Sequence, residues 1–270
     1  MPQTTYRAIF FDLDGTLLPL DMDAFMGGYF LSLEAFVEEH DLDVKRFTTA
    51  LRCGIGAMAH SDGAHTNEQQ FWQAFFAELG EYAQQADWPA LLAEFYAHDF
   101  GQIGAGMPPN PLAAEVVETL QAKGYPLALT TMPMFPPAAV KWRLNWGDLD
   151  PAAFARITTY DNSTAIKPHA AYYLENLAAF GCAPEEVLMV GNNTREDLAC
   201  LGVGMPAYLV TDCLLDPDGF DIETVEHGSL QDLLAFVRAL PDCAAPATCI
   251  APATGAVSCA SCVPCAPCEG

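Results

Sequence analysis

Short apolar runs that alternate with helical patterns constrain the fold of this 270-residue chain more than any other feature. A run of four to eight apolar residues is typical of a strand buried on both faces of a parallel sheet. Five such runs begin at residues 6, 125, 155, 186 and 206, and they read YRAIFF, YPLALTT, ARITTY, EVLMVG and PAYLVTD. Apolar residues at helical spacing occupy residues 112–123, 169–181 and 229–240. Strands that alternate with helices predict an α/β fold with a doubly wound parallel sheet.

Residues 20–105 interrupt this alternation. They contain aromatic-rich helical segments such as MDAFMGGYFLSLEAFVEEH and TNEQQFWQAFFAEL, and no convincing strand. Thr66 with Gln69 forms a capping-box signature at the start of the second segment. We therefore predict an all-helical domain over residues 20–105, inserted into an α/β core domain made of residues 1–19 and 106–240.

Residues 241–270 differ in composition from the rest of the chain. They are rich in alanine, proline and cysteine, and they lack aromatic residues, lysine and arginine. Proline recurs too often for a helix or a strand, so we predict a low-complexity tail without a fold of its own. Four of its cysteines, Cys259, Cys262, Cys265 and Cys268, follow a C-x-x-C spacing that also suits zinc or an iron–sulfur cluster. Both interpretations, an unfolded extension and a metal site, stay open.

The formal net charge of −24 limits the partners of the chain. Such an acidic protein repels phosphate backbones, so we expect no nucleic-acid partner. No segment reaches the roughly 18 uninterrupted apolar residues of a membrane span. The first residues, MPQTTYRAIFFD, lack the basic start and cleavage site of a signal peptide. We expect a cytoplasmic protein without a membrane partner, and no feature of the sequence indicates an oligomeric state.

Two carboxylates directly follow the first predicted strand. Asp12 and Asp14 stand two residues apart in FFDLDGT, so on an extended chain their side chains leave the same side. One interpretation is an ordinary turn in which Gly15 supplies the unusual backbone conformation. The other is a functional site, because doubly wound sheets bind ligands at the carboxyl ends of their strands. Paired carboxylates act there as nucleophile and acid–base, or hold a hard cation such as Mg²⁺.

Four segments resemble, in the correct order, the signatures of the haloacid dehalogenase superfamily. FFDLDGTLL resembles the first, LALTTMP the second, AIKPHAAYYLENL the third and VLMVGNNTREDLACLGVGM the fourth. The resemblance covers residues 5–212 and places the predicted insertion where capped members of the superfamily carry their cap domain. It implies a Rossmann-like core and the phosphatase branch, because members that cleave carbon–halogen bonds lack an acid at the position of Asp14.

The resemblance implies a role for each matching residue. Asp12 would attack phosphorus and form a phosphoaspartate, and Asp14 would serve as general acid and base. Thr131 and Lys167 would hold the oxygens of the transferring phosphoryl group. From the residues alone, Lys167 is also compatible with a solvated lysine at a helix start, and Thr131 with a turn residue. The implied cofactor is Mg²⁺, which would let the anionic Asp12 approach an anionic phosphate.

The fourth segment departs from the superfamily pattern. The resemblance implies metal contacts from Asp12, from the backbone carbonyl of Asp14, and from an acid after the fourth strand. This chain has Asn192 and Asn193 at that place, and either one could replace the missing carboxylate. An amide oxygen still binds Mg²⁺ but brings no negative charge, so we expect weaker metal binding. Asp197 follows as a further candidate near the metal.

We therefore predict a Mg²⁺-dependent phosphatase that acts on a small phosphorylated metabolite, with phosphoglycolate and sugar phosphates suggested by resemblance alone. Arg52, one of three basic residues in residues 20–105, is the candidate for a contact with the substrate anion. One alternative is a phosphomutase. Another is a catalytically weak or inactive binding protein on the same fold, which only the two asparagines support.

Overall fold

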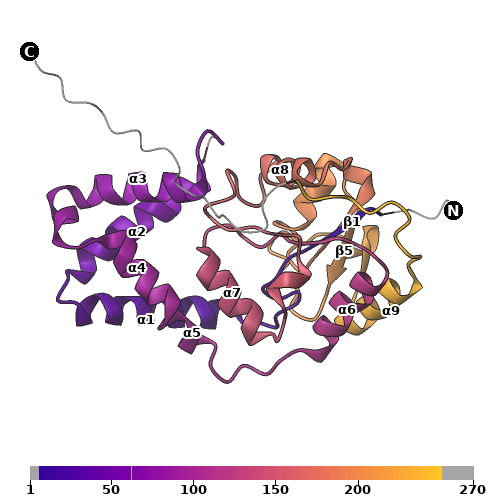
Figure 1. The fold of residues 1–270 in the computed structure, drawn as a ribbon, viewed down its shortest axis with the longest axis horizontal. Helices are drawn as coiled ribbons and strands as arrows, with labels where there is room; N and C mark the ends of the chain where they lie inside the picture. Colours follow the sequence, from indigo (N-terminus) through magenta and orange to yellow (C-terminus); the bar gives the residue numbers. More distant parts are fainter. Residues whose placement is uncertain (1–5, 62, 251–270) are drawn as a thin grey trace, which may run out of the picture.

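The computed structural model describes residues 6–61 and 63–250, and a six-stranded parallel sheet lies within its α/β part (Figure 1). The strands are β1 (Ala8–Phe11), β2 (Leu127–Leu129), β3 (Arg156–Ile157), β4 (Val187–Gly191), β5 (Ala207–Val210) and β6 (Glu226–Gly228). They lie in the order β3-β2-β1-β4-β5-β6, with parallel pairing throughout. The five predicted strands are confirmed. The sequence does not predict β6, because this edge strand reads EHG and offers no apolar run.

Helices cover both faces of the sheet. They are α6 (Pro111–Ala122), α7 (Pro137–Trp146), α8 (Ala170–Phe180) and α9 (Leu230–Ala239). Ile9 and Phe11 of β1 share one buried cluster with residues of α6, α7 and α9, whereas Ala8 and Phe10 share the other with residues of α8. The predicted doubly wound sheet is therefore confirmed, and the carboxyl ends of its strands are where a ligand site is expected.

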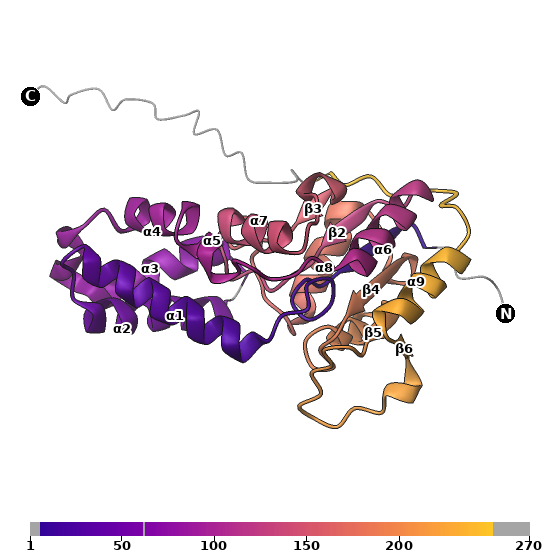
Figure 2. The same cartoon turned by 90° about the horizontal axis from the view of Figure 1, so that it is seen from below.

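Between β1 and α6 the described chain forms helices and no named strand. They are α1 (Met22–Glu39), α2 (Val44–Ala59), α3 (Asn67–Leu79), α4 (Trp88–Ala97) and α5 (Phe100–Ile103). We call residues 22–103 the helical lobe, and Figure 2 shows it beside the α/β part. The predicted capping box of Thr66 and Gln69 is present at the start of α3. Within the described residues, no helix combines the length and the hydropathy that crossing a membrane requires.

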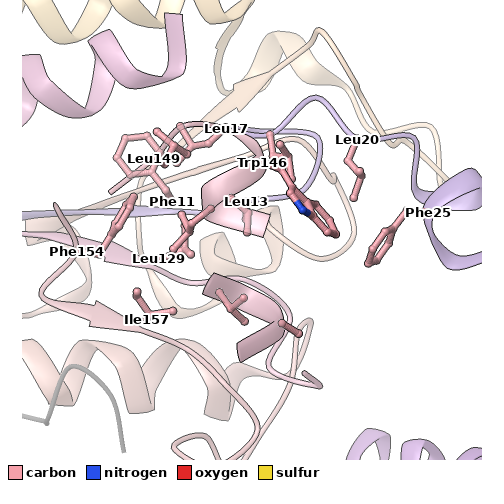
Figure 3. Packing of buried hydrophobic residues seen from close by; sticks show 14 of the residues in the cluster. Phe11, Leu13, Leu17, Leu20, Phe25, Leu129, Trp146, Leu149, Phe154 and Ile157 are labelled. Carbon is pink, nitrogen blue, oxygen red and sulfur yellow. The ribbon is translucent and has the colours of Figure 1, made fainter. Parts of the chain in front are cut away.

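One hydrophobic core continues from the sheet into the helical lobe. It contains Phe11 of β1, Leu13 and Leu17 of the following turn, Trp146 at the end of α7, and Phe25 of α1 (Figure 3). The ring centroids of Phe25 and Trp146 lie 6.1 Å apart. Buried aromatic side chains contribute much of a core's stability. The helical lobe is therefore packed against the α/β part close to the end of β1.

The first ten residues of the predicted tail make backbone contacts with the α/β part. The amides of Cys243, Ala247 and Ile250 donate to the carbonyls of Lys123, Arg7 and Ala179, at 2.8, 2.9 and 2.8 Å. Ala247 is buried. Residues 241–250 form no helix or strand, and these hydrogen bonds hold them against the α/β part. The four regularly spaced cysteines lie outside the described residues.

Candidate active site

Three neighbouring strands end side by side in the middle of the sheet. The amide of Asp12 donates to the carbonyl of Val190 at 2.8 Å, and the amide of Thr130 donates to the carbonyl of Phe11 at 2.6 Å. These bonds align the ends of β4, β1 and β2. Because parallel strands present their carboxyl ends at one edge, the polar residues that follow these strands come together there.

The turn after β1 depends on a glycine. The carbonyl of Leu13 accepts the amides of residues 16–18, which closes the turn. Gly15 has a φ of +84°, a backbone conformation that side chains other than glycine rarely adopt. A Cβ atom at Gly15 would also lie 2.2 Å from Nδ2 of Asn192. Gly15 therefore supplies both the turn and the space in which the loop after β4 approaches the two aspartates.

Lys167 joins two of the predicted site residues. Its Nζ donates to Oδ1 of Asp12 at 2.7 Å and to Oδ1 of Asp197 at 2.6 Å. Lys167 is only 2 % exposed. Burial alone would lower the pKa of Lys167, but the two carboxylates outweigh burial and hold this pKa well above its usual value. Lys167 is therefore a buried permanent cation, and its interpretation as a solvated lysine is wrong.

Asp197 supports the loop after β4. Its Oδ2 accepts the amides of Asn192 and Asn193, both at 2.9 Å, while its Oδ1 accepts from Lys167. A Cβ atom at Gly191 would lie 2.2 Å from Cγ of Asp197, so the glycine makes room for this carboxylate. Burial raises the pKa of Asp197 to about 6, against the opposing effect of Lys167. Both oxygens of Asp197 are occupied, which favours a role in positioning Lys167 over a direct metal contact.

The two asparagines make different contacts. Oδ1 of Asn192 accepts from the hydroxyl of Thr16 at 3.0 Å, and that hydroxyl lies 3.3 Å from Oδ2 of Asp12. Oδ1 of Asn193 instead accepts the amides of Arg195 and Glu196 within its own loop. The geometry therefore favours Asn192 as the residue that replaces the carboxylate ligand.

The hydroxyl of Thr131 has no hydrogen-bond partner among the described residues, although it is buried. The hydroxyl of Thr130 donates to the carbonyl of Phe11 at 3.1 Å. A buried hydroxyl without a partner is costly unless a ligand supplies one. Thr131 thus has the free hydrogen-bonding capacity that the predicted phosphate contact requires, and Thr130 does not.

Arg143 on α7 is a site residue that the sequence analysis missed. Its Nη1 donates to Oδ2 of Asp14, and its guanidinium carbon lies 4.9 Å from the ring centroid of Phe135. Arg143 is 1 % exposed. Its Nε and Nη2, like Oδ1 of Asp14, are buried without a partner in the described part of the chain. The sequence does contain an indication of this buried pair. Arg143 stands between the apolar residues Val140 and Leu144, and a buried basic side chain needs an acidic partner.

Burial raises the pKa of Asp14 above its ordinary value. The positive charge of Arg143 acts in the opposite direction, and the negative charge of Asp12 raises the pKa again, so the net shift is upward. A carboxyl group with a raised pKa is better able to donate a proton near neutral pH. The surroundings of Asp14 therefore suit a general acid.

Replacing Arg143 with methionine should lower the free energy of unfolding by about 3 kcal/mol, because it leaves the Asp14 carboxylate buried without its partner. Denaturant unfolding would measure the change. Lys141→Met is the matched control, since Lys141 is an exposed base on the same helix. Adding Asp14→Asn to Arg143→Met should recover part of the loss. Equal stability of the Arg143 and Lys141 variants would contradict the ion pair.

Arg52 gains no support as a substrate contact. It is exposed on α2, and its side chain forms no hydrogen bond or ion pair with the described residues. The neighbouring Leu51 and Ile55, by contrast, line a cavity between the helical lobe and the α/β part. The role of Arg52 stays a prediction.

The oxygen atoms at the carboxyl ends of the central strands are of the type that binds a hard cation. Asp12 and Asp14 supply carboxylates, Asn192 supplies an amide oxygen, and Oδ1 of Asp14 lacks a partner among the described residues. Within residues 6–61 and 63–250, no three His, Cys, Asp or Glu side chains form a ready set of metal ligands. A cation here would therefore depend on amide or backbone oxygens in addition to the two carboxylates, which Mg²⁺ accepts.

Comparison with known families assigns the class of this protein. The family model described as haloacid dehalogenase-like hydrolase matches residues 6–202, from β1 through the helical lobe to the loop after β4. The chain belongs to the haloacid dehalogenase-like hydrolases and is a hydrolase.

Individual relatives add detail. The chain is 29 % identical over 241 residues to a phosphoglycolate phosphatase of Shigella dysenteriae, covering 84 % of this chain and 91 % of that protein. It is 26 % identical over 249 residues to a phosphoglycolate phosphatase of Caulobacter vibrioides, covering 89 % and 94 %. The crystal structure of a HAD phosphatase from Thermococcus onnurineus superposes with a TM-score of 0.54 at 20 % identity, covering 87 % of this chain and 99 % of that chain. This last likeness shows a shared fold.

Proposed function

We propose that this protein is a Mg²⁺-dependent phosphatase that hydrolyses a small phosphorylated metabolite through a phosphoaspartyl intermediate. One observation carries the proposal: Asp12 directly follows the central strand β1 and accepts from Nζ of Lys167 at 2.7 Å, and the buried hydroxyl of Thr131 lacks a partner among the described residues. A carboxylate beside a fixed cation and a free hydroxyl can attack and hold a phosphoryl group. The similarity to phosphoglycolate phosphatases over most of the chain supports the same chemistry.

In the first half-reaction an oxygen of Asp12 forms a bond to phosphorus while the ester bond breaks. Asp14 gives its proton to the departing alkoxide, a role that its raised pKa favours. Lys167 and Thr131 stabilise the charge on the phosphoryl oxygens during the transfer. The alcohol leaves, and Asp12 carries an acyl phosphate.

In the second half-reaction water attacks the phosphorus. Asp14 is now a carboxylate and takes a proton from this water. The bond between phosphorus and Asp12 breaks, which releases inorganic phosphate. Arg143 pairs with Asp14 in this structure and stabilises its ionised form between the two steps. One buried carboxyl group thus serves both half-reactions.

Mg²⁺, when bound, supplies positive charge that reduces the repulsion between Asp12 and the phosphate. Asp12, Asp14 and Asn192 are the residues that would hold it, with Asp197 supporting the loop. The acidity of the whole chain makes such a cation more important, since the net charge is −24.

We also propose that the helical lobe acts as a cap over the site, in a domain made of residues 20–105. Asn67, the first residue of α3, supports this role. Its Nδ2 donates to the carbonyls of Pro133 at 3.0 Å and Ala165 at 3.2 Å. Pro133 follows Thr131, and Ala165 precedes Lys167, so Asn67 links the lobe to both phosphate-binding segments. A covered site of this kind favours small substrates over polymers.

The direct test is release of inorganic phosphate from para-nitrophenyl phosphate and from a panel of phosphorylated metabolites, with and without Mg²⁺. We expect turnover that requires Mg²⁺ and is abolished by a chelator. A correctly folded protein without turnover at any Mg²⁺ concentration would instead favour a binding protein on the same fold. The two asparagines at the place of the superfamily's acid suggest this alternative.

Asn192→Asp should lower the Mg²⁺ concentration needed for half-maximal activity by roughly tenfold, because a restored negative charge attracts the cation more strongly than an amide does. Mg²⁺ titrations of activity, together with calorimetry of Mg²⁺ binding, would measure the shift. Asn193→Asp is the matched control, since its oxygen is used within its own loop. The same metal requirement in both variants and the parent would exclude Asn192 as a ligand.

A further inference from the structure

A cavity of about 230 Å³ lies between the helical lobe and the segment that follows Thr131. Helices α1 to α4 supply one wall, and residues 134–138 with Tyr160 supply the other. None of its lining residues is a lysine, arginine, histidine, aspartate or glutamate. In a chain with a net charge of −24, a space of this size without any charged lining residue is a distinct local environment.

The polar side-chain groups that line the cavity are uncharged: the hydroxyls of Tyr29, Tyr96 and Tyr160, and the indole N–H of Trp72. The hydroxyls of Tyr29 and Tyr96 bond to each other at 2.7 Å. Burial raises the pKa of Tyr29 to about 12 and also raises the pKa of Tyr96. Burial likewise raises the pKa of Tyr160, with a further contribution from Glu68. All three therefore stay uncharged near neutral pH, and the lining offers no cation to a carboxylate or a second phosphate.

One residue of the cavity wall contacts the Arg143–Asp14 pair of the candidate active site. Phe135 lines the cavity, and its ring lies 4.9 Å from the guanidinium carbon of Arg143, which pairs with Asp14. The amide of Tyr160 donates to the carbonyl of Phe135 at 3.1 Å. Met134 and Phe135 line the cavity three and four residues after Thr131, so a group bound there contacts the segment that continues from Thr131.

We propose that this cavity receives the alcohol portion of the substrate, and that this portion is apolar, either a short aliphatic chain or a single aromatic ring. The inference rests on the proposed phosphatase function. An apolar cavity of about 150 Å³ is large enough to bind benzene, so the space here accepts a somewhat larger group. A small anionic group, such as the carboxylate of phosphoglycolate, loses its hydration in this cavity and gains no countercharge.

The test compares phosphate esters of primary alcohols, whose leaving groups have similar acidity. The series runs from ethyl to hexyl phosphate and adds benzyl phosphate and phosphoglycolate. We expect kcat/KM to rise about threefold to fourfold with each methylene buried, and to level off when the cavity is full. Benzyl phosphate should exceed phosphoglycolate by at least about tenfold.

A variant that fills the cavity gives a second test. Ala93 is exposed on α4 yet lines the cavity, so Ala93→Phe reduces the space without removing a buried side chain. It should lower kcat/KM for benzyl phosphate by about tenfold and for ethyl phosphate by much less. Ala77→Phe on α3 is the matched control, because Ala77 is exposed and does not line the cavity. Equal effects of the two variants on benzyl phosphate would overturn the inference.

Calorimetry with the Asp12→Asn variant separates this inference from the proposed function. Benzyl phosphate should bind this variant at least about tenfold more tightly than phosphoglycolate does. If no ester is hydrolysed but this binding preference is found, the phosphatase proposal fails and the apolar site stands. If esters are hydrolysed with no dependence on chain length, or with phosphoglycolate preferred, the apolar site is refuted while the phosphatase stands.

Discussion

An Asp12→Asn variant is expected to lose more than about 10³-fold of its phosphate-releasing activity, because an amide cannot form the acyl phosphate and removal of a catalytic nucleophile commonly costs at least this much. The variant should fold, since Lys167 keeps the carboxylate of Asp197 at 2.6 Å. Initial rates with saturating Mg²⁺ would measure the loss. Asp148→Asn is the matched control, because Asp148 is exposed and its left-handed backbone conformation suits asparagine.

Chemical trapping of the acyl phosphate tests the same prediction directly. Borohydride reduction during turnover should convert the acyl phosphate at position 12 to homoserine in the parent protein, and peptide mass spectrometry would locate it. The Asp12→Asn variant should show no such product. A reduction product at another carboxylate would rule out Asp12 as the nucleophile. An Asp12→Asn variant as active as Asp148→Asn would also rule it out.

The sheet was predictable from the sequence because its central strands are buried on both faces. β1 and β4 are fully buried, so almost every residue in them is apolar and the runs stand out. The residues of β6 are exposed or half-buried, so this strand offers no apolar run and escaped prediction. The contacts of segment 241–250 with Arg7 and Ala179 were not predictable either, because they join residues that are far apart in sequence and composition does not indicate such contacts.

The site was predictable only where a residue directly follows a strand or matches a signature. Asp12 and Thr131 follow β1 and β2, and Lys167 matches the third signature, so the sequence places all three. Their chemical roles stay predictions. Arg143 reaches Asp14 from a helix 129 residues later, and only the fold brings the two together. The choice between the two asparagines likewise needed the contacts of each side chain.

Lys167→Met is expected to have the other large effect, on activity and stability together. The parent ammonium contacts Asp12 and Asp197 at 2.7 and 2.6 Å, and all three residues are buried. Methionine has a similar shape without the charge, so it leaves two carboxylates facing each other in a region with little water. Losing the partner of a buried charge costs about 3–5 kcal/mol of unfolding free energy. Activity should fall by more than about 10²-fold, because a donor to the phosphoryl oxygens is also lost.

Denaturant unfolding and initial rates of Lys167→Met, compared with Lys45→Met at an exposed lysine, would measure both effects. A second substitution then separates charge from packing. Adding Asp197→Asn to Lys167→Met removes one of the two facing charges while keeping the side-chain volume, so the double variant should regain part of the lost stability. It should not regain activity, because the cation that faces Asp12 is still missing. If Asp197→Asn destabilised the Lys167→Met background as much as it destabilises the parent, the two residues would act independently, and Lys167 would owe its buried position to packing and not to the carboxylates around it.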